Sequence, residues 1–100
     1  MDKLDDIIHQ PIRLRIMAAL NVLPGNEPIE FTRLKAIIGA TDGNLGAHLG
    51  TLESAAYVTI TKDFVGRKPR TRIAMTRGGR RAFAQHVAKL RDILDGAANG

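Results

Sequence analysis

The sequence predicts a mainly helical α+β domain that carries one small β-hairpin. Apolar residues recur at helical spacing in four separate segments, and two alternating segments flank a turn at 65–70 that contains Gly and Pro. The chain has 100 residues, of which 44% are hydrophobic and 25% are charged, as in a folded single domain. We therefore expect one domain over residues 1–95, with a three-helix core, the hairpin and a long C-terminal helix, followed by a frayed tail at 96–100.

The N-terminal segment predicts two helices and a short extended piece. Residues 2–8 form an acidic helical turn, and Pro11 suits the first turn of the next helix, where its missing N–H costs nothing. Turn residues at 24–28 end that helix. Residues 29–31 are too few to stand alone, so we expect them to pair as one edge of a small sheet.

Two further helices are predicted at 32–39 and 42–55, joined by a tight turn. Thr41 or Asp42 can cap the second helix, because either side chain can accept a hydrogen bond from its first free amides. Two short helices in this arrangement form a helix-turn-helix, whose second helix can lie in the major groove of DNA. In the first of these helices, the apolar residues expected to face inward are Leu34, Ile37 and Ile38.

The helix at 42–55 contains three glycines, each of which costs about 1 kcal/mol relative to alanine. Leu45, Leu49 and Leu52 fall on one stripe of this helix and are expected in the core. The opposite face has no long charged side chain and could therefore enter a groove closely. The residues of this face are Gly43, Asn44, Ala47, Gly50, Thr51 and Ser54, with Gly46 and His48 on its flanks.

The C-terminal half predicts the hairpin and the long helix. Residues 57–64 alternate β-branched and polar side chains, and residues 71–76 are expected to form the returning strand. Thr76 is expected to cap the last helix, which runs to about Asp95. The apolar seam of that helix consists of Phe83, Val87, Leu90 and Leu94.

Positive charge is concentrated in residues 62–81. The net charge of the chain is +5, yet this segment holds eight basic residues and the single acid Asp63. Such a density indicates a polyanionic partner, although a solvated surface that aids solubility is the alternative. The basic residues are Lys62, Arg67, Lys68, Arg70, Arg72, Arg77, Arg80 and Arg81.

Four stretches carry a family resemblance: HQPIRLRIMAAL, FTRLKAIIGATDGNLGAHLGTLESAAYV, VGRKPRTRIAMT and GRRAF, which together cover roughly residues 8–84. In this order and spacing, the chain resembles winged-helix transcriptional regulators of the broad MarR/ArsR-like group, in particular the short single-domain members. The resemblance implies a winged helix-turn-helix with a recognition helix at about 42–55 in the major groove of double-stranded DNA. It also implies a wing at 66–70 on the backbone or minor groove, and a homodimer built from the terminal helices.

The chain departs from the pattern of this group in the recognition helix. Relatives often carry Ser near Gly46 and a basic residue near Gly50, so here affinity should rest more on Arg33, Lys35 and the wing. Relatives also usually have Gly at position 56. Ala56 must therefore either adopt the same conformation at some cost or end the helix differently.

The predicted DNA-binding surface combines the helix-turn-helix with the wing. Asn44, His48 and Thr51 are the groups able to hydrogen-bond base edges or phosphates, and Arg67 and Lys68 at the wing tip are the first candidates for phosphate contacts. Arg77, Arg80 and Arg81 fit a solvated or ion-paired face at least as well as a DNA contact. The full set expected to bind DNA is Arg33, Lys35, Asp42, Gly43, Asn44, Ala47, His48, Thr51, Arg67, Lys68 and Arg70.

The terminal helices carry the expectation of a dimer. The seam of the last helix continues past the length that a domain this small needs for its core, and an apolar N-terminal turn could pack on it from a partner chain. The alternative is that both pack only within one chain. The residues assigned to the dimer interface are Leu4, Ile7, Ile8, Phe83, Val87, Leu90, Ile93 and Leu94.

The sequence argues against an enzyme. The chain has no Cys, its only Ser is Ser54, and it contains no nucleophile-elbow, P-loop or zinc-protease pattern. His9, His48 and His86 are scattered in the sequence. A dimer could bring His9 and His86 together as metal ligands, but structural or surface roles are favoured, so no metal and no cofactor are predicted.

The sequence also predicts the location of the protein and the partners that it lacks. No apolar run approaches the roughly 20 residues that span a bilayer, and the acidic N-terminus has no signal-peptide core, so we expect a cytoplasmic protein without a membrane partner. The sequence identifies neither an operator nor a small-molecule effector. The alternative function is a winged-helix protein-interaction module or a protein that binds DNA without sequence preference.

Overall fold

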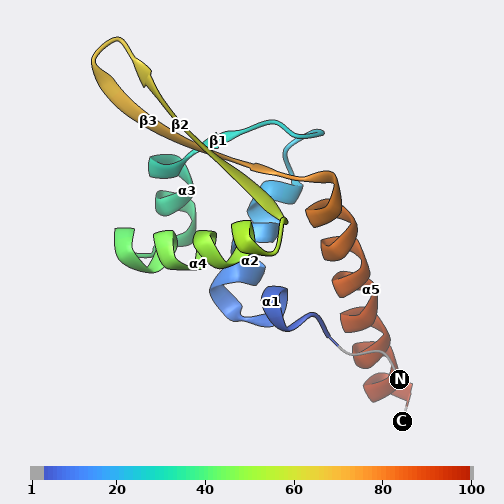
Figure 1. Ribbon diagram of the computed structural model, residues 1–100. Coiled ribbons are helices and arrows are strands. Elements are labelled where there is room, and N and C mark those ends of the chain that lie inside the picture. The colour runs from blue at the N-terminus through green and yellow to red at the C-terminus, as the bar shows by residue number, and fades with distance from the viewer. Residues whose placement is uncertain (1–3, 100) are drawn as a thin grey trace.

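Helices and strands follow one another in the predicted order along residues 4–99, the part of the chain that the computed structural model describes, with side chains described for residues 4–96. Helices α2, α3 and α4 gather on one another, the β2–β3 hairpin projects beyond them on one side, and α5 lies on another side (Figure 1). This is the winged-helix architecture predicted from the sequence. The elements are α1 (Asp6–His9), α2 (Pro11–Asn21), β1 (Ile29–Glu30), α3 (Phe31–Ile38), α4 (Asp42–Ser54), β2 (Val58–Val65), β3 (Lys68–Met75) and α5 (Arg77–Asn99).

The three strands form one antiparallel sheet in the order β1-β3-β2. Ile29 pairs with Ile73, which confirms that this short segment forms an edge of the sheet. The hairpin turn contains only Gly66 and Arg67, and Gly66 has the left-handed φ of 64° that a two-residue turn requires. The strands therefore extend further toward the tip than predicted, and Lys68 lies in β3 instead of in the turn.

Local capping sets the boundaries of the helix-turn-helix. Helix α3 ends at Gly39, whose φ of 74° is left-handed. The hydroxyl of Thr41 accepts a hydrogen bond from the amide of Asn44 at 3.1 Å, so Thr41 is the N-cap of α4. Thr76 caps α5 in the same way, by accepting a hydrogen bond from the amide of Gly79 at 2.9 Å.

The core is aliphatic and lies between the three central helices and the sheet. Leu45, Leu49 and Leu52 are buried, which confirms the stripe predicted for α4. The prediction that Ile37 points inward is wrong, because its side chain is 52% exposed. The buried residues of α3 are Leu34 and Ile38, one helical turn apart, and Ile37 lies about 100° around the helix from Ile38.

Helix α1 is held on the core by a side-chain hydrogen bond from a distant segment. The hydroxyl of Tyr57 donates to Asp5 Oδ2 at 2.6 Å, while Asp5 Oδ1 accepts from the amides of Ile7 and Ile8 at the start of α1. The bond to Asp5 raises the pKa of Tyr57 to about 12. The short helix is thereby attached beside the corner that joins α4 to β2.

Two residues assigned to a dimer interface lie instead in the core of the single chain. Ile8 is 0% exposed and Phe83 is 8% exposed, so their side chains are covered without a partner. Helices α1 and α5 pack on α2 and on each other, and this packing covers the two side chains. Helix α5 also continues to Asn99, past the end expected near Asp95.

Candidate nucleic-acid interface

The exposed face of α4 is low and open. A Cβ atom placed on Gly43, Gly46 or Gly50 would meet nothing within 4 Å. Asn44 is exposed beside them, whereas Thr51 is half-buried as a residue and its hydroxyl donates to the carbonyl of Ala47 at 3.3 Å. The backbone of this helix can therefore approach a flat or convex ligand closely, and the carboxamide of Asn44 is its most accessible polar group.

His48 differs from the expectation of a free base-reading group. Its Nδ1 lies 3.1 Å from Nη1 of Arg13 on α2, and Arg13 Nε also donates to the carbonyl of Ile7. The imidazole is thus tied to a cation at the flank of α4. This contact could not be predicted from the sequence, because Arg13 and His48 are 35 positions apart in the chain.

A cation lies at the start of α4, across the helix-turn-helix. Lys35 Nζ is 2.8 Å from Asp42 Oδ1, and the side chains of Lys35 and Asp42 are 41% and 76% exposed. Exposed ion pairs of this kind contribute little to stability. Lys35 can therefore exchange Asp42 for a phosphate, and Arg33 on the same helix is also exposed.

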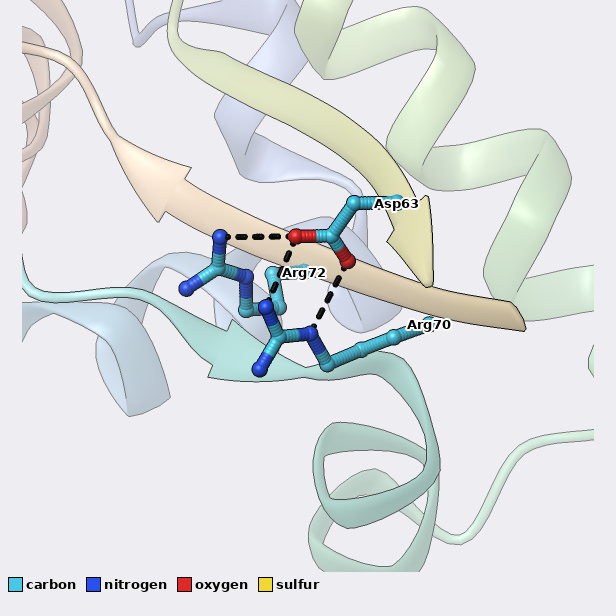
Figure 2. A network of polar contacts seen from close by, with 3 residues as sticks. All are labelled: Asp63, Arg70 and Arg72. Atoms are coloured by element: carbon cyan, nitrogen blue, oxygen red, sulfur yellow. Dashed lines mark hydrogen bonds and ion pairs between the residues drawn. The ribbon is translucent and has the colours of Figure 1, made fainter. Parts of the chain in front are cut away.

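The wing carries a three-residue charge network that includes Arg70, one of the predicted DNA-binding residues (Figure 2). Arg70 donates to both carboxylate oxygens of Asp63, at 2.9 and 2.7 Å, and Arg72 donates to Oδ2 at 3.2 Å. The hydrogen bond from Arg70 is the largest cause that lowers the pKa of Asp63. Arg70 is therefore paired with a carboxylate on the neighbouring strand, and its contact with a phosphate stays a prediction.

Strand alternation gives the wing two different faces. Asp63 and Arg70 are directly paired across the strands and lie on the face that points away from the core. Ile60 and Lys62 belong to the other face, which continues from the core toward the tip. A groove of about 240 Å³ separates this face from α4, and its lining residues are Phe31, Gly46, Leu49, Ile60, Lys62 and Thr71.

Lys62 is the residue of this surface that the sequence prediction missed. It lines the groove together with Gly46 of α4, so it belongs to the side of the wing that faces the helix. Strict alternation from the buried Val58 could have identified it, because Val58, Ile60 and Lys62 share one face. At the tip, Arg67 and Lys68 are exposed as predicted.

Arg80 has a structural role outside this surface. Its guanidinium donates to the carbonyls of Asn21, Leu23 and Gly25 and to the side chain of Asn21. These carbonyls follow the end of α2, where backbone acceptors lack helical partners. Arg80 therefore joins the start of α5 to the end of α2, whereas Arg77 and Arg81 are exposed.

The fold brings together two histidines that are separated in the sequence. The ring centroids of His9 and His86 are 5.4 Å apart within one chain, so no partner chain is needed to bring them together. His86 is 1% exposed, both of its ring nitrogens lack a hydrogen-bond partner, and burial lowers its pKa. Among the residues that the structure describes, no group of three or more His, Cys, Asp or Glu side chains could hold a metal ion.

Across the described part of the chain, no helix combines the length and the apolar character that a membrane span needs.

Comparisons with known proteins agree with this geometry. Residues 12–94 match the family described as a winged helix DNA-binding domain. The chain is 34% identical over 84 residues to an uncharacterised protein of Methanocaldococcus jannaschii, and the match covers 84% of this chain and 88% of that protein.

Two solved structures share the fold. A transcriptional regulator homologue from Pyrococcus horikoshii aligns with a TM-score of 0.83 and 28% identity, over 91% of this chain and 87% of that one. A PadR family transcriptional regulator from Eggerthella lenta aligns with a TM-score of 0.69 and 24% identity, over 93% of this chain and 87% of that one. The narrower resemblance to the MarR/ArsR-like group stays a prediction, because the neighbour whose family is named is of the PadR family.

Proposed function

Because the chain belongs to the winged-helix DNA-binding domain family, we propose that it is a transcriptional regulator that binds double-stranded DNA sequence-specifically as a homodimer. The observation that carries the proposal is one continuous surface, formed by the open face of α4, the groove beside it and the basic tip of the wing. A helix and a hairpin so placed fit the major groove and the neighbouring backbone or minor groove. Chromosomal DNA as the target also supports the cytoplasmic location.

Helix α4 supplies the close approach in this proposal. Its small face lets the backbone lie deep in the major groove, where Asn44 can form a bidentate contact with adenine. Thr51 is the second candidate for a base contact once its hydroxyl leaves the carbonyl of Ala47. The negative Asp42 at the start of the helix is balanced by Lys35.

Affinity comes mainly from cations around the helix. Lys62 faces the groove beside α4, and Arg67 and Lys68 lie exposed at the tip of the wing. Phosphate contacts from these side chains fix the register of the protein on the duplex. Arg70 and Arg72 contribute less, since Asp63 neutralises part of their charge.

Salt dependence of binding tests the role of the wing. We expect the double variant Arg67→Ala/Lys68→Ala to reduce the magnitude of the slope of log affinity against log salt by about 2, since each phosphate contact contributes about 0.9. Fluorescence anisotropy on a labelled duplex measures this slope. The matched control is Arg81→Ala/Arg91→Ala, which removes two exposed charges from α5 and should leave the slope nearly unchanged. Equal effects of the two double variants would overturn the assignment of the wing.

One observation favours the non-specific alternative. The face of α4 lacks long polar side chains, so few groups are available to read bases. Selection of bound fragments from a genomic library decides between the two functions. A shared motif, with a preference that Asn44→Ala or Thr51→Ala alters, supports the regulator, whereas enrichment without any motif supports binding without sequence preference.

A further inference from the structure

The tip of the wing exposes a large apolar side chain that the fold does not use. Phe64 is 70% exposed, and Val65 beside it is 56% exposed. The last cross-strand pair that packs on the core is Ile60 with Ile73, and Phe64 pairs with Pro69 beyond it. A single exposed apolar residue needs no explanation in general, but an aromatic ring at the end of a basic arm is in place to meet a ligand.

Strand alternation assigns Phe64 to the face of β2 that borders the groove beside α4 nearer the core. Alternation along β2 puts Phe64 on the same face as Ile60 and Lys62, and those two residues line the groove beside α4. Four strand residues beyond Ile60 extend the arm by about 13 Å at 3.3 Å per residue. DNA seated on α4 would therefore meet Phe64 where the wing reaches the adjacent groove.

We propose that Phe64 is a minor-groove wedge, whose ring enters between two base pairs, partly unstacks them and bends the duplex. This inference rests on the proposed function and adds a residue that selects DNA by its deformability. Proteins that bind the minor groove use apolar wedges such as Phe in this way, and the resulting kink opens the groove toward the protein. Pyrimidine–purine steps unstack most easily, so the wing is expected to select such a step without a hydrogen bond to a base.

The charge and the width of the wing tip both favour a minor groove of DNA as the ligand of Phe64. Arg67 in the turn and Lys68 at the start of β3 lie close to Phe64 in the hairpin and can hold the phosphates on either side of the inserted ring. Asp63, next to Phe64 in the chain, lies on the opposite face and is paired with two arginines, so its charge is neutralised there. The two strands of the wing are about 4.8 Å apart, and their side chains make the arm wider than a minor groove of about 6 Å. The arm therefore enters only a minor groove that has been opened.

The test measures base unstacking in a duplex recovered by selection with the intact protein. A hydroxyl-radical footprint locates the step under the wing, and 2-aminopurine is placed there. We expect wild-type protein to raise the fluorescence of 2-aminopurine and to shorten the end-to-end distance of a doubly labelled duplex. Phe64→Ala should lose both signals and weaken binding by about tenfold, from the cost of losing one aromatic–base stack.

Two matched variants keep the result specific. Phe64→Leu retains an apolar wedge and should keep part of both signals, whereas Val65→Ala, on the opposite face, should keep both in full. Thermal unfolding of each variant establishes that the fold is intact. Unchanged fluorescence on binding of wild-type protein, with the wing protecting the groove, overturns the wedge and leaves the proposed function standing.

Other outcomes distinguish failure of the Phe64 wedge from failure of the proposed DNA-binding function. Absence of any binding at low salt by wild-type protein overturns the proposed function and the wedge together. A change of oligomeric state in Phe64→Ala, with the unstacking and bending signals intact, would assign the tip to contacts between copies of the chain and overturn the wedge alone. Loss of both signals in Phe64→Ala with a wild-type footprint elsewhere supports the wedge.

Discussion

At the scale of single residues, Asp63 controls how much of the positive charge of the wing is available to a ligand. Its carboxylate accepts hydrogen bonds from Arg70 and Arg72, two of the four basic residues between positions 67 and 72. Asp63→Asn removes the negative charge while keeping the size of the side chain. We expect tighter DNA binding and a salt slope steeper by up to about 2, because both guanidinium groups become available to phosphates.

Anisotropy titrations at several salt concentrations measure this change. The control is Asp92→Asn, which removes an exposed carboxylate on α5, far along the chain from the wing. Weaker binding by Asp63→Asn would mean that the network is needed to hold the wing in its binding shape.

His86 makes the stability of the fold depend on pH. Burial lowers its pKa below the usual 6.5, with a further contribution from His9, while Asp5 acts in the opposite direction and Lys89 in the same direction as His9. The unfolded chain therefore binds a proton near pH 6.5 that the folded chain does not bind. The free energy of unfolding is therefore not reduced by this group above about pH 6.5, and it decreases as the pH falls below that value.

The variant His86→Leu tests this account. Leucine fills a similar volume without two unpartnered nitrogens, so we expect the free energy of unfolding to rise by about 1–3 kcal/mol and to change less between pH 7 and about pH 5. Urea denaturation at a series of pH values measures it. His9→Gln is the comparison, since it removes the neighbouring ring but leaves His86 buried. A variant that keeps the full wild-type pH dependence would assign the effect to another group.

At the scale of elements, local signals in the sequence predicted most of what the structure contains. Caps such as Thr41 and Thr76 and the left-handed Gly39 act within one helical turn, so their chemistry can be read from neighbours in the chain. Strand pairing beyond the turn was less accurate. The predicted turn at 65–70 is in fact Gly66 and Arg67 alone, because cross-strand pairing outweighed the turn signal of Pro69.

The junction of α4 and β2 contains backbone strain that a substitution can relieve. Ala56 has a φ of 62°, so of the two alternatives for this position the structure shows the strained one. Ala56→Gly should raise the free energy of unfolding by about 0.5–1 kcal/mol, which is the left-handed cost less the added chain entropy. Ala55→Gly is the matched control, because Ala55 has a helical φ of −82° and should be destabilised. Chemical denaturation compares them, and stabilisation of neither or of both would contradict the strain.

The glycines of α4 offer a test of whether this helix lies against DNA. A Cβ on Gly50 meets nothing within 4 Å, so Gly50→Ala should stabilise the helix by about 0.5–1 kcal/mol. If the face fits closely into a groove, the same methyl group should weaken DNA binding. Thermal unfolding and anisotropy measure the two effects separately. Gly79→Ala is not a usable comparison, since its Cβ would clash with the carbonyl oxygen of Tyr57 and would disturb the fold.

At the scale of the whole molecule, contacts between distant segments decide what the sequence could not. The sequence placed Arg70 and His48 on the DNA surface by position alone, but their partners Asp63 and Arg13 become neighbours only in the folded chain. Residues on the surface can be predicted from alternation and helical spacing. Whether a surface cation has an ion-pair partner cannot be predicted in this way, because that depends on which groups the tertiary fold brings within about 4 Å of it.

The elongated shape leaves one end of the molecule uncovered. The principal extents are 58, 25 and 21 Å, and α5 runs past the core, where Ile93 is 55% exposed and Leu94 is 67% exposed. The first half of this helix belongs to the monomer core, so the dimer residues that remain available are concentrated in its second half. A second copy of the chain packed there would present two α4 helices to half-sites about one helical turn apart.

Substitutions on α5 test this arrangement. We expect wild-type protein to sediment as a dimer and Leu94→Asp to sediment as a monomer, because a carboxylate would be desolvated in an apolar interface. A monomer engages only one half-site, so its DNA affinity should fall at least about tenfold through lost avidity. The wing variant Arg67→Ala/Lys68→Ala is the control and should remain dimeric while binding DNA weakly. A wild-type monomer, or a dimer that survives Leu94→Asp/Ile93→Asp, would place the contact between copies away from this end of α5.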